Sequence, residues 1–370
     1  MTNLRFLQAD GVDFTGDFQS LLLELRWLRW KYCPLNFAAD NFHLKKLVVL
    51  DLSKSAISEE WGGWDLLKMV TELKVLDLMW CRSLKRTPNL STFQRLEILT
   101  LANCVNLEEL HPSIGCLMKL ERLSLNRCKI SQLPKFNGAM KELKVIIAYD
   151  CVDLVHIPSS IGNLASLQRL ELGGCRSLTE IPDSIGNLAS LIDLDLARTS
   201  ITKLPESIGN LQNLRVLNIC ETGLTKLPES IGAMKELKVI IAYDCLNLVH
   251  IPSSIGNLAS LQRLKLGFCR SLTEIPDSIG NMASLVKLDL KGTSITKLPE
   301  SIGNLQNLRI LYIWGTSITE LPDAIGMLTK LQKLEAWDCE NLERLPRAVF
   351  APSFPTNPSQ DTLSSRLPSA

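Results

Sequence analysis

A short apolar motif, Leu-x-x-Leu-x-Leu, recurs along most of the chain and constrains its fold more than any other feature. Fifteen copies begin at positions from Leu4 to Leu331, and twelve prolines from Pro88 to Pro346 recur 22 to 24 residues apart. Sequences with such a period form linear arrays, because one repeat is too small to bury its apolar side without its neighbours. We therefore expect a single array over residues 1–350 in place of the several compact domains that a chain of 370 residues would otherwise suggest.

Each repeat divides into a strand and a return segment. In Leu-x-Leu, alternate side chains point to opposite faces of a strand, so the leucines enter the core and the intervening residues face outward. A proline then fixes φ, and Ser-Ile-Gly-Asn-Leu places residues such as Ile161 and Leu164 one helical turn apart on the buried side. This is the pattern of the leucine-rich repeat. It predicts an α/β repeat fold, a curved horseshoe solenoid with a parallel β-sheet on the concave face and short helical or irregular return segments on the convex face.

A slot after each strand holds a small residue, which is cysteine in some repeats and threonine in others. Nine of the eleven cysteines occupy this slot. Because they occur once per repeat and never as a Cys-x-x-Cys pair, they fit neither a disulfide framework nor a zinc site, which needs several converging ligands. We expect Cys151, Cys175, Cys245 and Cys269 to be buried against turning backbone amides, and Cys220, which lies on the strand, to face outward.

Charge and composition limit the partners. The chain has 40 Lys and Arg against 39 Asp and Glu, so a basic nucleic-acid footprint is not expected. The first residues lack a secretory signal, and charges, Gly or Pro interrupt every apolar run before the roughly 18 residues that span a bilayer. We expect a protein of the cytoplasm, with the nucleus as a second location, that contacts neither nucleic acid nor membrane. Residues 351–370, rich in Pro and Ser, are expected to form a disordered tail.

Residues 138–231 and 232–325 form a tandem duplication, with 76 of 94 aligned positions identical. Ten of the 18 differences fall on the 20 outward strand positions, and only eight fall on the other 74. Drift of exposed positions is one explanation, but it predicts changes on every exposed face, whereas return segments such as KLPESIGNLQN are unchanged. The alternative is that the concave strand face was remodelled to bind something. Strands about 4.8 Å apart give fifteen repeats an inner arc on the order of 67 Å, a size that suits a protein or a long peptide.

The substitutions turned an acidic face of small residues into a basic and aromatic one. Corresponding outward residues are Glu171 and Lys265, Gly174 and Phe268, Asp193 and Lys287, Ala197 and Lys291, Asn218 and Tyr312, Cys220 and Trp314, and Glu221 and Gly315. One lateral row holds Tyr243, Gly267, Lys291, Trp314 and Trp337 in five successive repeats. Neighbouring exposed Trp and Tyr side chains are typical of interface hot spots. The candidate protein-binding residues of the concave face are Tyr243, Lys265, Phe268, Lys287, Lys291, Tyr312, Trp314, Lys333, Glu335 and Trp337.

The N-terminal third carries a more specific resemblance. Its motifs are Glu24-Leu25-Arg26-Trp27-Leu28, Pro34-Leu35, Asn41-Phe42, Leu47-Val48, Asp51-Leu52-Ser53 followed by Trp61, and Thr87-Pro88-Asn89-Leu90-Ser91. Over residues 3 to about 115 the chain resembles the start of the repeat domain in plant nucleotide-binding leucine-rich-repeat disease-resistance receptors with an N-terminal TIR domain. The later PxSIGNLxxL repeats resemble those receptors and also intracellular plant repeat proteins of the Ras-associated kind.

The resemblance covers the repeat region alone. The sequence contains no GxxxxGK[ST] phosphate loop and no TIR-like segment, so the resemblance does not imply ATP switching or TIR chemistry, and we expect a fragment or a truncated receptor. The four histidines fall in return loops, and the GxSxG and HExxH motifs are absent. We expect no catalytic residues, no enzyme activity, no cofactor and no metal.

The resemblance implies a recognition module whose concave face binds a protein, either a pathogen effector or a guarded host protein. In a full receptor the module also contacts its own nucleotide-binding domain and converts ligand contact into activation. A stand-alone intracellular scaffold or substrate adaptor is the alternative. That function needs a second docking element such as an F-box, and none is visible in the sequence.

Overall fold

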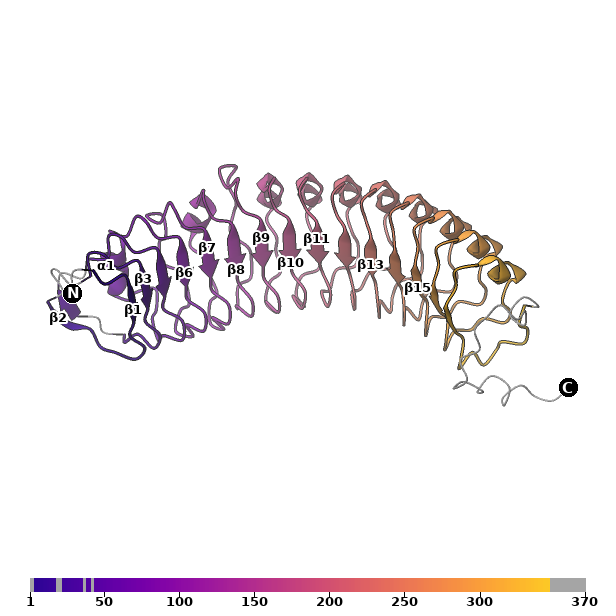
Figure 1. The fold of residues 1–370 in the computed structure, drawn as a ribbon, viewed down its shortest axis with the longest axis horizontal. Coiled ribbons are helices and arrows are strands. Elements are labelled where there is room, and N and C mark those ends of the chain that lie inside the picture. Colours follow the sequence, from indigo (N-terminus) through magenta and orange to yellow (C-terminus); the bar gives the residue numbers. More distant parts are fainter. Residues whose placement is uncertain (1–2, 18–21, 36–37, 41–42, 347–370) are drawn as a thin grey trace. The chain divides into compact units, whose positions relative to one another are not determined.

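The computed structural model describes residues 3–17, 22–35, 38–40 and 43–346. The chain divides into two compact units, Met1–Ile201 and Thr202–Ala370. In each unit short parallel strands stand side by side in chain order, and short helices follow one another along the return segments (Figure 1). The expected disordered tail, residues 351–370, lies outside the described residues.

The main sheet of the first unit is parallel, and each strand pairs with the strands of the neighbouring repeats. Its strands are β1 (Phe6–Gln8), β3 (Trp27–Arg29), β5 (Val49–Asp51), β6 (Val75–Asp77), β7 (Ile98–Thr100), β8 (Arg122–Ser124), β9 (Val145–Ile147), β10 (Arg169–Glu171) and β11 (Asp193–Asp195). The return segments include helix α1 (Gly63–Leu67) and the 3₁₀ helices η1 (Pro112–Cys116), η2 (Ser159–Asn163) and η3 (Asp183–Asn187). Strands β2 (Thr15–Asp17) and β4 (Ala38–Asp40) pair in a separate small sheet, which the repeat pattern does not predict.

The second unit repeats the same architecture with greater regularity. Its strands are β12 (Val216–Asn218), β13 (Val239–Ile241), β14 (Arg263–Lys265), β15 (Lys287–Asp289), β16 (Ile310–Tyr312) and β17 (Lys333–Glu335). Its 3₁₀ helices are η4 (Glu206–Asn210), η5 (Glu229–Ala233), η6 (Ser253–Asn257), η7 (Asp277–Asn281), η8 (Glu300–Asn304) and η9 (Asp323–Met327).

The leucines of each repeat form the core between strand and return segment. The central strand residues Leu264 and Leu311 are fully buried, whereas their neighbours on the strand are partly or fully exposed. Burying one such side chain contributes about 1.5–3 kcal/mol relative to leaving it in water. Ile161 and Leu164 of the η2 segment are also fully buried, as their spacing predicts. These observations confirm the leucine-rich-repeat fold class, with a parallel sheet and short helical return segments in each unit.

Three tryptophans belong to the core at the start of the first unit. Trp30, Trp61 and Trp64 are buried and pack edge to face, with ring centroids 6.3 Å and 5.2 Å apart for successive pairs. The indole Nε1 of Trp61 donates to the carbonyl of Pro34 at 3.2 Å, and that of Trp64 donates to the carbonyl of Ser58 at 2.8 Å. The larger rings fill this end of the core, where the proline-led 3₁₀ segment is missing and helix α1 takes its place.

The small slot is buried as predicted, and the four cysteines named for it are fully buried. The slot side chains donate to backbone carbonyl oxygens, whereas the sequence suggested contact with turning backbone amides. The Cys269 Sγ lies 3.0 Å from the carbonyl oxygen of Ala242 in the preceding repeat. The Thr293 Oγ1 lies 2.6 Å from the carbonyl oxygen of Leu290 in its own repeat. Thiols and hydroxyls are donors, and a carbonyl at the end of a strand has a lone pair to accept them.

Candidate protein-binding face

All ten candidate residues lie in the second unit, on strands β13 to β17 or in the turns that follow them. Because neighbouring strands pair in parallel, equivalent positions form lateral rows. One row, for example, runs through Lys265, Asp289, Tyr312 and Glu335. Trp337 and Lys333 are exposed, and the other eight candidates are half-buried. None of the ten belongs to the fully buried core.

Four of the candidates make a continuous chain of ring contacts, which we call the aromatic strip: Tyr243, Phe268, Trp314 and Trp337. The ring centroids of Tyr243 and Phe268 are 5.1 Å apart, and those of Phe268 and Trp314 are 5.5 Å apart. The two tryptophans stack at 4.2 Å with an interplanar angle of 11°. Trp337 is 49% exposed at the end of the strip. Exposed, contiguous aromatic surface of this kind marks interaction sites.

The Phe268 ring reaches into the next repeat because Gly292, which lies beside it there, has no side chain. Its own φ is +61°, in the left-handed region, and its backbone N–H donates to the carbonyl of Lys291 at 2.7 Å, which holds it there. A Cβ at Gly292 would lie 2.6 Å from the Phe268 Cδ1, so the ring could not keep this position over a residue with a side chain. The first copy has the opposite arrangement, with Gly174 and Arg198 at the equivalent positions.

Lysine side chains lie among the rings. The Lys291 Nζ lies 5.4 Å from the Tyr243 ring centroid and 5.8 Å from that of Trp314. The Tyr312 ring has the Lys287 Nζ at 4.4 Å and the Lys333 Nζ at 5.3 Å. Each cation–π contact at a partly exposed site is worth about 0.5–1 kcal/mol. The structure therefore brings the aromatic and basic candidates together, and Lys265 joins them only through its place in the strand register.

Glu335 and Lys333 form an ion pair on β17. Their Oε1 and Nζ atoms are 2.8 Å apart. The hydrogen bond to the Glu335 carboxylate, together with its charge, raises the pKa of Lys333 above its ordinary value. The charge of Lys333 is therefore neutralised by Glu335. Lys265 on β14 and Lys287 on β15 have no such ion-pair partner among the described residues.

The copy comparison missed Asp289, because it is identical to Asp195 in the first copy. Asp289 is 3% exposed, and its Oδ2 lies 3.6 Å from the Lys291 Nζ. Its Oδ1 has no hydrogen-bond partner among the described residues. A Cβ at Gly267 would lie 3.3 Å from this oxygen, so the buried carboxylate lies directly beside Gly267.

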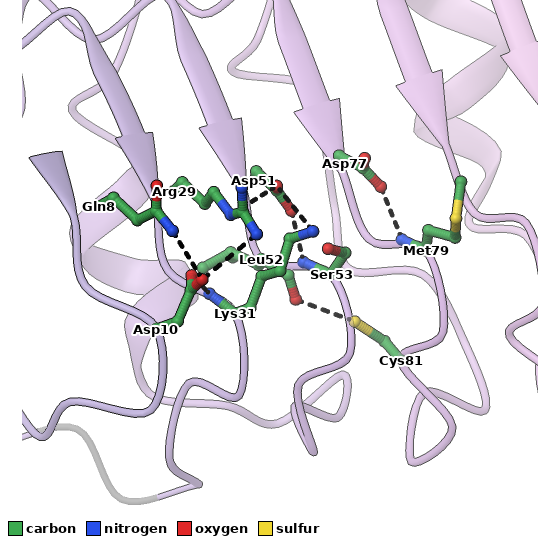
Figure 2. Close-up of polar contacts among 10 residues, drawn as sticks. All are labelled: Gln8, Asp10, Arg29, Lys31, Asp51, Leu52, Ser53, Asp77, Met79 and Cys81. Atoms are coloured by element: carbon green, nitrogen blue, oxygen red, sulfur yellow. Dashed lines mark hydrogen bonds and ion pairs between the residues drawn. The ribbon is translucent and has the colours of Figure 1, made fainter. Parts of the chain in front are cut away.

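In the first unit, aspartates at the strand position of Asp289 have a backbone hydrogen bond to their Oδ1 atom, which Asp289 lacks. The Oδ1 atoms of Asp51 and Asp77 accept backbone N–H groups two residues further along, at 2.9 Å from Ser53 and 2.8 Å from Met79 (Figure 2). Figure 2 also shows that the cations on this part of the sheet are paired, with Arg29 placed 3.3 Å from Asp10. The charges of the N-terminal sheet face are thus largely compensated by its own residues.

A hollow of about 490 Å³ lies in the turns of the first unit, and the repeat pattern does not predict it. Its chemistry is aromatic and basic, because the Arg82 guanidinium lies 5.2 Å from the Trp80 ring centroid. It is lined by Tyr32, Lys54, Ser55, Ala56, Trp80, Arg82 and Ser83. These residues come from successive repeats, so only their adjacency in space reveals the hollow.

Within the described ranges no three His, Cys, Asp or Glu side chains gather closely enough to hold a metal ion. A search of the same residues finds no helix with the length and apolar character needed to cross a membrane.

Comparison with known proteins gives concordant results. The family model described as "Leucine-rich repeat region" matches residues 74–197, 182–287 and 269–350. Disease resistance protein RPV1 of Vitis rotundifolia is 38% identical over 111 residues, which are 30% of this chain and 8% of that protein. Disease resistance protein RUN1 of the same species is 43% identical over 96 residues, which are 26% of this chain and 7% of that protein. The chain thus matches less than a tenth of the length of these two relatives.

A solved structure has the same fold. The leucine-rich-repeat protein LIC12759 of Leptospira interrogans superposes with a TM-score of 0.56 at 26% sequence identity, covering 82% of this chain and 85% of that one. The two plant relatives are disease-resistance proteins of the TIR, nucleotide-binding, leucine-rich-repeat class, the class that the N-terminal motifs resemble. The chain belongs to the leucine-rich-repeat family, and its relatives include plant disease-resistance proteins.

Proposed function

We propose that the outward sheet face of the second unit recognises a protein, as the ligand-sensing part of a plant immune receptor. The observation that carries the proposal is the aromatic strip, in which Tyr243, Phe268, Trp314 and Trp337 touch in sequence on a solvent-facing surface. Trp and Tyr are enriched among the few side chains that dominate binding energy at protein interfaces. A face that serves only to close the solenoid has no need of two stacked indoles, one of them exposed.

The partner in this role is a pathogen effector or a host protein that the receptor guards. The disease-resistance relatives support it, and their much greater length suggests that the repeats act within a longer chain that contains a nucleotide-binding domain. The function is binding without turnover. Ligand contact on the sheet face would then be passed on to that domain.

The first prediction tests the strip directly. A random peptide display library is selected on the wild-type chain, and each enriched peptide is titrated against the wild type and a Trp314→Ala/Trp337→Ala variant. Each lost anchor should weaken binding by about 2 kcal/mol, or roughly thirtyfold. Both rings lie outside the buried core, so the unfolding midpoint of the variant should remain close to that of the wild type.

A Trp80→Ala variant is the matched control, because Trp80 is a half-buried indole of the first unit that lies outside the strip. It should leave the peptide affinities unchanged. The proposal is wrong if the enriched peptides bind the double variant as tightly as the wild type. It is also wrong if the double variant loses its fold while the surviving fraction binds normally, since the rings would then be structural.

A further inference from the structure

Three cations stand together at the edge of the aromatic strip. Arg263 and Lys287 are register partners on neighbouring strands, and Lys265 lies two residues beyond Arg263 on the same face. Adjacent strands are about 4.8 Å apart, so the three side chains start close to one another. None of the three has an ion-pair partner among the residues that the structure describes.

The first copy of the duplication shows the same arginine in a compensated state. Arg169, the counterpart of Arg263, forms an ion pair with Glu171 and another with Asp193, whose Oδ2 lies 3.8 Å from its Nε. In the second copy these two acids are replaced by Lys265 and Lys287. The net charge of the three positions changes from −1 to +3.

The nearby carboxylates do not neutralise this cluster. The Asp289 Oδ2 lies 3.6 Å from the Lys291 Nζ, and the Glu335 carboxylate bonds to Lys333. Like charges at about 4 Å repel by roughly 1 kcal/mol even at the dielectric constant of bulk water, and by more near a protein surface. The cluster is therefore short of negative charge, which a binding partner can supply.

We propose, resting on the function above, that the partner docks an acidic segment here. Its anionic side chains pair with Arg263, Lys265 and Lys287, and an apolar side chain beside them packs on the aromatic strip. The Lys287 Nζ lies 4.4 Å from the Tyr312 ring centroid. Lys291 connects this ring to the aromatic strip, because its Nζ lies 5.9 Å from the Tyr312 centroid and 5.8 Å from that of Trp314. The planar guanidinium of Arg263 offers a carboxylate or a phosphate two parallel hydrogen bonds.

The test uses three labelled octapeptides of alternating Glu–Tyr, Gln–Tyr and Lys–Tyr, titrated by fluorescence anisotropy at low and high salt. The Glu–Tyr peptide should bind the wild-type chain most tightly, and its affinity should fall as salt is raised. A Lys265→Glu/Lys287→Asp variant restores the residues of the first copy and hence the ion pairs of the arginine. We expect it to weaken Glu–Tyr binding by about tenfold or more while leaving Gln–Tyr binding unchanged.

A Lys235→Glu/Lys297→Asp variant makes the same change in net charge at two exposed lysines outside the cluster, and should bind like the wild type. A phosphoserine–Tyr peptide identifies the anion. Tighter binding than that of Glu–Tyr assigns the cluster to phosphate, and equal or weaker binding assigns it to carboxylate.

The inference is overturned if Gln–Tyr binds as tightly as Glu–Tyr, or if the Lys265→Glu/Lys287→Asp variant leaves Glu–Tyr binding unchanged. Those results leave the proposed function standing when binding of both peptides is still lost in the Trp314→Ala/Trp337→Ala variant. If neither variant affects any peptide, the inference and the proposed function both fail.

Discussion

Two glycines on the candidate face make room for the larger side chains beside them. Gly292 lets the Phe268 ring reach Trp314, and Gly267 leaves room for the Lys291 stem, whose Cγ would lie 3.0 Å from a Cβ at that position. In the first copy Arg198 occupies the place of Gly292 and lies over the Tyr149 ring at 5.2 Å. Two positions therefore differ together between the copies, Gly174 and Arg198 in the first and Phe268 and Gly292 in the second, and the Phe268 ring as placed leaves no room for a Cβ at Gly292.

Variants of Gly292 and Gly315 separate the effect of the Phe268–Gly292 contact from that of backbone strain. Gly292 and Gly315 both have positive φ, of +62° and +64°, but a Cβ at Gly315 meets nothing closer than 3.8 Å. Gly315→Ala should therefore lower the free energy of unfolding by about 1 kcal/mol, the cost of left-handed backbone for an alanine. Gly292→Ala should lower it further and also weaken peptide binding, because the Phe268 ring must move. Urea unfolding and anisotropy titrations measure both effects, and equal losses in the two variants would contradict the role of Gly292.

At the scale of the repeat, the slot side chain decides which carbonyl is bonded. Threonine donates within its own repeat, as Thr222 does to the carbonyl of Ile219 at 2.8 Å. Cysteine donates to the preceding repeat, as Cys245 does to the same carbonyl at 3.0 Å. A cysteine slot therefore links one repeat to the one before it.

The element-scale prediction concerns the reactivity of these thiols. Cys151, Cys175, Cys245 and Cys269 are fully buried in the slot, so a bulky maleimide should not modify them in the native state. Cys116 is exposed and should react fully, and Cys220, which is half-buried, should react more slowly. Mass spectrometry of native and urea-unfolded samples identifies the modified sites. Rapid native labelling of all four slot cysteines would show that they do not belong to the core.

The repeat period was enough to predict the strands and return segments, because each apolar position is set by burial in the stack. It did not predict the β2–β4 pair or the Trp30, Trp61 and Trp64 cluster, since the N-terminal repeats depart from the regular pattern. The duplication identified the changed side chains of the face. Comparison of the two copies could not identify Arg263 and Asp289, because these residues are identical in both copies. Only the residues around them changed.

Because the small slot after each strand recurs along the chain and often holds cysteine, the protein contains many buried thiols. Eight cysteines are buried among the described residues, and several share the same position in their repeats. Burial raises the pKa of the Cys104 thiol to about 12, because the thiolate would lose its hydration. Burial likewise raises the pKa of Cys33 to about 12. These two buried thiols, which are uncharged at neutral pH, couple the free energy of unfolding to pH in the alkaline range.

The last prediction gives this coupling a sign and a control. An unfolded cysteine loses its proton near pH 8.5, roughly, whereas folded Cys104 keeps it up to about pH 12, so between these values the folded state binds more protons. Its contribution to stability is complete below the unfolded pKa, and the free energy of unfolding should then fall by about 1.4 kcal/mol per pH unit for each such thiol. Urea unfolding at pH values of about 8, 9 and 10 measures the slope. Cys104→Thr introduces the residue that occupies this slot in other repeats, and it should reduce the slope by the contribution of one thiol. Cys116→Ser, at an exposed site, should leave the slope unchanged. An unaltered slope in Cys104→Thr would mean that the Cys104 thiol titrates alike in the folded and unfolded chains.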